Sequence, residues 1–302
     1  FTELYDVGNA LPYQIEGTNF TGSLIIGHTT TGTISSAHYN TGIGIAALDA
    51  LTTGDQNVAV GYNVLTATNT GYGNTAIGSY AGDALTSGYR NVAVGNLALS
   101  AEDTHGFNVA IGYAALFSQN AGADAYNVAV GSSAGTSITT GVGNTLIGGL
   151  AGDALTTGSS NVAIGTSALG SEDAHGRNVA IGYHALMDQD AGDEAYNVAV
   201  GYNAGENVTT GKNNTLIGGS AGDALTTGGS NVAIGKSALS LEDTGSKAVA
   251  VGFGTLANQN YNGDSYNVAM GYQAGNDITT SIQNVLIGAL AGDAITTGGG
   301  NV

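Results

Sequence analysis

The sequence contains no cysteine, no tryptophan and only one proline among its 302 residues. Without cysteine the chain has no disulfide scaffold, no thiolate metal site and no cysteine nucleophile. Basic residues are scarce too, because five Lys and Arg stand against 23 Asp and Glu, which gives a formal net charge of -18. A surface this acidic repels phosphate groups, so we expect neither nucleic acid nor an anionic membrane as a partner.

Long apolar runs are also lacking. No segment approaches the roughly 18 consecutive apolar residues of a membrane-spanning helix, and the first residues do not show the charged-then-apolar pattern of a signal peptide. We therefore expect no membrane insertion. The chain starts at Phe1 and stops at Val302 inside a repeated motif, so we expect a processed or truncated piece of a longer protein.

Glycine is abundant, with 51 residues, and it marks an internal repeat. A unit of the form Asn-(Val/Thr)-(Ala/Leu)-(Val/Ile)-Gly recurs from residue 23 to the end in steps of 17 residues, with an occasional step of 19. Successive steps of 17, 19, 17 and 17 make a longer repeat of 70, so that the unit at Asn91 returns at Asn161 and Asn231. A fixed period of this kind indicates a repeat architecture.

Each position of the unit has a physical interpretation. Val, Thr and Ile at the second and fourth positions favour a short strand with one packed face. Ala or Leu at the third position indicates that the other face is crowded as well, and we interpret that face as a contact between chains, made by Leu146, Leu216 and Leu286. Asn and Gly are expected at the corners, because Asn amides stack into ladders and tolerate left-handed backbone, and Gly permits positive φ or close backbone approach. These corners include Asn57, Gly61, Asn91, Gly95, Asn161, Gly165, Asn231 and Gly235.

One repeat therefore makes one coil. Seventeen residues extend to at most about 56 Å, which suits a flattened two-strand roll or a small triangle. We predict an all-β fold, a parallel β-solenoid or β-roll of 17- to 19-residue coils, in which residues 23–302 form one continuous fibre domain after an adaptor at residues 1–22. Coils this thin bury little apolar area alone, so we expect a homotrimer of intertwined or side-by-side chains.

The Asn-Val-Ala-Ile-Gly units at residues 161–165 and 231–235 resemble those in the heads of trimeric autotransporter adhesins. The longer form, Asn-Val-Ala-Ile-Gly-Tyr-x-Ala-Leu with Asp-Ala-Leu-Thr-Thr-Gly, is similar to repeats of bacteriophage fibre proteins, those of cyanophages especially. The likeness covers residues 23–302. It implies a homotrimeric tail or head fibre on the virion surface that binds a host cell-surface glycan or protein, or presents another module that does.

An acidic pair followed by histidine is the best candidate for a metal site. The two copies are Glu102, Asp103 and His105, and Glu172, Asp173 and His175. A third copy has Gly245 in place of the histidine. Carboxylates suit Ca²⁺, and imidazole suits a transition metal. We prefer a simpler interpretation, a solvated outer turn whose acidity keeps the rod in solution, and therefore expect no cofactor and no effect of a chelator on the melting temperature.

Other patterns are explained by position in the repeat. Two Gly-x-Ser-x-Gly matches, at residues 131–135 and 218–222, have the spacing of a nucleophile elbow. Leu150 occupies the same position in another coil, so we expect no catalytic or cofactor-binding residue. Five tyrosines follow a corner glycine and are expected to form a stacked ladder, either structural or sugar-binding. They are Tyr62, Tyr113, Tyr183, Tyr202 and Tyr272.

The sequence thus favours a structural fibre over an enzyme. The leading expectation is a phage fibre for host attachment. The alternative is a bacterial surface adhesin or a self-assembling extracellular filament, placed at the cell surface or outside the cell. A polysaccharide-cleaving tailspike would need paired carboxylates in a groove, and an ice-binding solenoid would need its Thr pairs on a flat face, whereas here they lie beside turn glycines.

Overall fold

The computed structural model describes residues 13–17, 20–27 and 34–302. In these ranges the chain consists of strands and turns, and it divides into two compact units, Phe1–Asn127 and Val128–Val302. The all-β prediction is confirmed. The described residues contain no helix that is long and apolar enough to cross a membrane.

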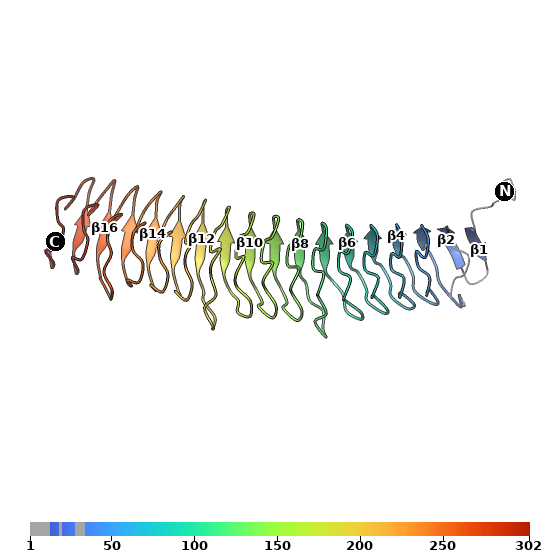
Figure 1. Ribbon diagram of the computed structural model, residues 1–302. Helices are drawn as coiled ribbons and strands as arrows, with labels where there is room; N and C mark the ends of the chain where they lie inside the picture. The colour runs from blue at the N-terminus through green and yellow to red at the C-terminus, as the bar shows by residue number, and fades with distance from the viewer. Residues whose placement is uncertain (1–12, 18–19, 28–33) are drawn as a thin grey trace. The chain divides into compact units, whose positions relative to one another are not determined.

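The first unit stacks short strands side by side (Figure 1). Its strands are β1 (Tyr13–Gly17), β2 (Phe20–Ile26), β3 (Thr41–Ile43), β4 (Val58–Val60), β5 (Thr75–Ile77), β6 (Val92–Val94) and β7 (Val109–Ile111). From β2 to β7 each strand pairs in parallel with the strand one coil later, so that Ala59 stands beside Ala76. The β1 strand pairs antiparallel with β2. The expected adaptor thus contains β1 and the start of β2, whereas its residues 1–12 and 18–19 lie outside the described part.

The second unit has the same construction. Its strands are β8 (Val128–Val130), β9 (Thr145–Ile147), β10 (Val162–Ile164), β11 (Val179–Ile181), β12 (Val198–Val200), β13 (Thr215–Ile217), β14 (Val232–Ile234), β15 (Val249–Val251), β16 (Val268–Met270) and β17 (Val285–Ile287). They pair in parallel and in register from β8 to β17. Each unit is therefore a parallel β-solenoid whose coils follow the sequence repeat.

The middle residue of each three-residue strand points into the coil. In β4, β9 and β16 it is buried, and the residues on either side of it are partly or fully exposed. Leu146 and Leu216 are 0% exposed and Leu286 is 7% exposed within their own chain. The prediction that these leucines pack chain against chain is therefore wrong. The faces are reversed, because a thin coil has room inside for Ala or Leu and turns its β-branched residues outward.

A glycine elsewhere in the coil makes room for each third-position leucine. Leu99 and Leu169 are buried nine residues into their coils, whereas the coil of Leu146 has Gly152 at that position. A Cβ added to Gly152 would lie 2.8 Å from Leu146 Cδ2. Between the coils of Leu169 and Leu146, leucine thus changes from the ninth position to the third, and the summed size of the two side chains stays similar, as a packed interior favours.

The corner glycines are required for both of the reasons inferred from the sequence. Gly61, Gly95, Gly165 and Gly235 have φ between 133° and 138°. A Cβ on Gly95 would also lie 2.3 Å from the carbonyl oxygen of Gly112, one coil later. Neither the backbone angle nor the available space admits a side chain at this corner.

The corner asparagines form the predicted ladder. Asn57, Asn91, Asn161 and Asn231 are buried. Asn57 Oδ1 accepts the backbone N–H of Asn74 at 3.0 Å, and its Nδ2 donates to the Gly71 carbonyl at 2.8 Å. Asn161 repeats the first bond, accepting the N–H of Asn178 at 3.0 Å. The left-handed backbone is not at the asparagine but at the residue before it, as at Ser160, where φ is 61°.

Candidate metal centre

The twelfth residue of each coil, counted from the corner asparagine, belongs to an interior column. About half of the coils have a buried aliphatic side chain there. These are Leu51, Leu85, Ile138, Leu155, Val208, Leu225 and Ile278. The column is polar in the remaining coils of each 70-residue block. Its glutamates are Glu102, Glu172 and Glu242, and its glutamines are Gln119, Gln189 and Gln259, all 0% exposed.

The expectation that these acidic turns lie in solvent is therefore wrong for their glutamates. The sequence pair Glu-Asp separates on folding, because Glu172 occupies the interior column whereas Asp173 stays exposed. A carboxyl group in an apolar column has a large cost unless its oxygens are bonded. The hydrogen-bond partners of each carboxylate oxygen therefore decide whether the glutamate is satisfied by the protein or can bind a further group.

In the second copy, only one oxygen of Glu172 is bonded. Its Oε1 accepts the backbone N–H of His175 at 3.0 Å. Its Oε2 is buried and has no hydrogen-bond partner. His175 Nδ1 is buried without a hydrogen bond as well, although it lies 3.4 Å from Glu172 Oε1. The neighbouring Gln189 does not supply the missing donor, since its Nε2 donates to the Thr209 carbonyl at 2.8 Å.

The third copy, which lacks the histidine, has no such deficit. Glu242 Oε1 accepts the N–H of Gly245 at 2.7 Å. Its Oε2 accepts Gln259 Nε2 at 3.0 Å and the N–H of Tyr261 at 3.2 Å. The same fold position thus satisfies a buried carboxylate fully when histidine is absent.

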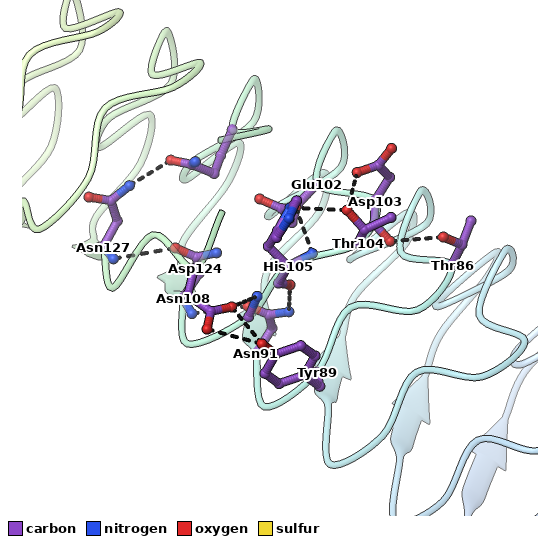
Figure 2. Close-up of polar contacts among 12 residues, drawn as sticks. Thr86, Tyr89, Asn91, Glu102, Asp103, Thr104, His105, Asn108, Asp124 and Asn127 are labelled. Atoms are coloured by element: carbon purple, nitrogen blue, oxygen red, sulfur yellow. Dashed lines mark hydrogen bonds and ion pairs between the residues drawn. The ribbon is translucent and has the colours of Figure 1, made fainter. Parts of the chain in front are cut away.

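The first copy resembles the second (Figure 2). Glu102 Oε1 accepts the N–H of His105 at 3.1 Å, and Glu102 Oε2 is buried without a hydrogen-bond partner. The imidazole is held differently, because His105 Nδ1 lies 3.0 Å from Thr104 Oγ1, whereas the second copy has Ala174 there. Figure 2 also shows Thr86 donating from its hydroxyl to the Asp103 carbonyl, at 3.0 Å, which anchors the turn to the coil before it.

The structure brings both predicted triads together and adds a fourth ligand to one of them. Potential ligand atoms of Glu102, Asp103 and His105 lie within 4.8 Å of one another. In the second copy, Glu172, Asp173, His175 and Asp190 meet the same limit. Sequence reasoning missed Asp190 and the glutamine column. Aligning all coils at their twelfth residue would have exposed Glu and Gln in a column of Leu, Ile and Val.

Burial dominates the electrostatics of the second copy. Burial raises the pKa of the Glu172 carboxyl, and the backbone N–H and imidazole of His175 oppose that rise. The negative charge of Asp190 raises this pKa further. The backbone N–H of Ala191 has the smallest effect, a lowering. A positive charge placed among these groups would oppose the rise, because it stabilises the ionised carboxylates.

Two other sequence features find simple places in the structure. Of the five tyrosines expected to form a ladder, Tyr183 and Tyr202 stack on each other, with ring centroids 5.4 Å apart, whereas Tyr62 meets Tyr80 edge-on. The serines of the two elbow-like motifs, Ser133 and Ser220, have φ of 56° and 53°. Leu150 has φ of 57° at the equivalent position. This backbone conformation recurs with unrelated side chains, which agrees with a positional origin of the motif.

Comparison with known proteins identifies no relative, since no family model, curated protein or solved structure matches the chain.

Proposed function

We propose that the chain is a non-enzymatic structural fibre, the shaft of a virion tail or head fibre that serves host attachment. The observation that carries this proposal is the coil-to-coil template within each unit. The Val58 N–H donates to the Asn74 carbonyl at 2.8 Å. In the buried asparagine ladder, the Asn74 N–H donates to Asn57 Oδ1 and so joins the same two coils a second time. A chain whose every coil pairs with its neighbours resists bending and proteolysis, which suits a spacer.

Self-association through the outer strand face is part of the proposal. The first and third residues of β3–β17 are Val, Thr, Ile or Met and carry no charge, although the chain has a net charge of -18. Ile147 and Ile217 are 38% and 37% exposed. An uncharged apolar strip on an otherwise acidic protein favours contact with a second copy of the same strip. This face replaces the buried leucines as the contact of the expected homotrimer.

The exposed aromatic rings support the proposal that the chain attaches to sugars of a host cell surface. Tyr202 and Tyr272 are 62% and 54% exposed. Each stacks on an aromatic ring of the preceding coil. Tyr202 stacks on Tyr183, and Tyr272 stacks on Phe253, with ring centroids 5.4 and 5.5 Å apart. Flat pairs of rings with free hydroxyl groups offer the amphipathic surface on which sugar rings pack.

The first test is the solution mass. We expect light scattering to give three times the chain mass of 29.7 kDa and negative stain to show elongated particles of uniform length. Ile147→Lys combined with Ile217→Lys should give a folded monomer, because charges on the outer strip repel one another. Thr140→Lys, at an exposed turn, is the matched control and should leave the trimer intact. A wild-type chain that stays monomeric at every concentration would contradict the association.

The biological setting needs a separate test. Antibodies raised against the chain should label fibres on virions in immunogold electron microscopy. Labelling of a bacterial envelope, or of filaments that grow without limit, would favour the adhesin or extracellular filament instead.

A further inference from the structure

We propose that the turn at residues 172–175 binds a divalent first-row transition metal with the ligand preference of Zn²⁺, through Glu172, Asp173, His175 and Asp190. The four side chains bring potential ligand atoms within 4.8 Å of one another. One imidazole nitrogen with carboxylate oxygens is a donor set that Zn²⁺ accepts in tetrahedral geometry. This inference is independent of the fibre role, because it concerns one turn and not the assembly.

The unbonded atoms are the main argument. Glu172 is 0% exposed, yet its Oε2 has no hydrogen-bond partner, and neither has the buried Nδ1 of His175. A buried polar atom without a partner is destabilising, and more so when the group is charged. One cation coordinated by both atoms would satisfy them together.

The third copy is an internal comparison. Its Glu242 has the same place in the interior column, but both of its oxygens are bonded by protein donors. Gly245 stands where the other copies have histidine. The second carboxylate oxygen, Oε2, thus lacks a donor in the copies that have an imidazole beside it, and it has two donors in the copy that does not. A structural role alone would not couple these two features.

The donor set argues against Ca²⁺. That ion takes six to eight oxygen ligands, whereas this turn offers three carboxylates and an imidazole. The two histidine-containing copies should also differ in affinity. The first copy has Asn120 at the position of Asp190 and therefore offers three ligands instead of four.

Zinc binding by the untagged 302-residue chain tests the proposal. Equilibrium dialysis with Zn²⁺ should show one tight site and one weaker site per chain, and excess Ca²⁺ should not displace the tightly bound ion. His175→Gly, which copies the third block, should weaken the tight site at least about tenfold, since even indirect partners of a metal cost 10- to 100-fold when removed. Asp190→Asn, which copies the first block, should turn the tight site into a second weak one.

A matched control and a spectroscopic readout separate ligation from folding. Glu242→Gln alters the same column in the copy without histidine and should leave zinc binding unchanged. Co²⁺ in the tight site should give visible d–d absorption that Zn²⁺ abolishes and that His175→Gly lacks. Circular dichroism confirms that each variant is folded, and Asp190→Asn, at an exposed residue, serves if His175→Gly is not.

The proposal also reverses the chelator expectation drawn from the sequence. A chelator should lower the melting temperature of the zinc-loaded chain and leave that of His175→Gly unchanged, because a bound ion stabilises only the folded state. Absence of tight zinc binding, tight binding that survives both His175→Gly and Asp190→Asn, or displacement by Ca²⁺ would overturn the assignment.

Discussion

At the scale of single residues, the coil depends on positions with positive φ. Leu65 and Leu99 have φ of 48° and 53° although leucine disfavours this region. A non-glycine residue in left-handed backbone costs roughly 1–2 kcal/mol, so burial of these side chains has to outweigh the strain. Glycine at a corner serves a different purpose, because there the next coil approaches too closely for any side chain.

Two glycines on either side of the Asn144 corner separate backbone strain from steric exclusion. Gly143 has φ of 68°, and a Cβ there would meet nothing nearer than Ser160 Oγ at 3.9 Å. Gly148 has φ of 141°, and its Cβ would lie 2.4 Å from the Gly165 carbonyl oxygen. We expect Gly143→Ala to lower the free energy of unfolding by about 1 kcal/mol and Gly148→Ala to lower it several-fold more. Urea denaturation measures both, and equal losses would show that coil spacing is not the constraint.

At the scale of the strand and its coil, much could be predicted from the sequence because the repeat aligns equivalent residues. The strands, the asparagine ladder and the glycine corners follow directly from recurring residue types. Which strand face is interior does not, because alternation defines two faces without saying which one the chain closes around. Leu146 could be placed only by noticing that Gly152 accompanies it, and Glu172 only by comparing its position with Leu155 across coils.

The exchange of interior volume predicts a compensating pair of substitutions. Leu146→Ala should lower the free energy of unfolding by about 2–5 kcal/mol, since it leaves a cavity in a packed interior. Leu146→Ala with Gly152→Leu should recover part of that loss, because other coils hold Ala and Leu in this arrangement, for example Ala163 with Leu169. Chemical denaturation measures the free energy, and light scattering checks the mass.

The mass measurement distinguishes the two interpretations of Leu146. A buried leucine leaves the oligomeric state unchanged when it is shortened. Dissociation of the assembly without loss of chain stability would restore the contact between chains that the sequence suggested.

At the scale of the whole molecule, the stability of the fold depends on the protonation of its many carboxyl groups, several of which are partly buried. Burial raises the pKa values of Asp83, Asp153 and Asp223, which share the tenth position of their coils, and that of Glu172. A carboxyl group whose folded pKa is above its unfolded pKa stabilises the fold most when protonated, and this contribution is lost as the pH rises through the folded value. Protonation also reduces the repulsion of a chain with a net charge of -18.

We therefore expect the metal-free chain to melt at a higher temperature at about pH 4, close to the ordinary pKa of a carboxyl group, than at pH 7. Asp193 and Asp264 act in the opposite direction. The backbone N–H of Glu194 and then Lys212 lower the pKa of Asp193, and Lys247 lowers that of Asp264. These two carboxylates are exposed, at 75% and 41%, and solvent screens them. Differential scanning calorimetry at both pH values measures the change.

A matched variant and added salt identify the cause of this change. Asp223→Asn should make the pH dependence smaller, whereas salt should suppress only the part due to net charge. Melting temperatures that fall on acidification would contradict the prediction.

The asparagine ladder has a consequence for how the number of repeats can change in evolution. Asn144 Oδ1 accepts the N–H of Asn161, and Asn161 Oδ1 accepts the N–H of Asn178, at 2.9 and 3.0 Å. Loss or duplication of one 17-residue coil by recombination between similar gene segments would therefore join edges that already match. The number of coils in each unit can therefore change in one genetic event without any new type of residue.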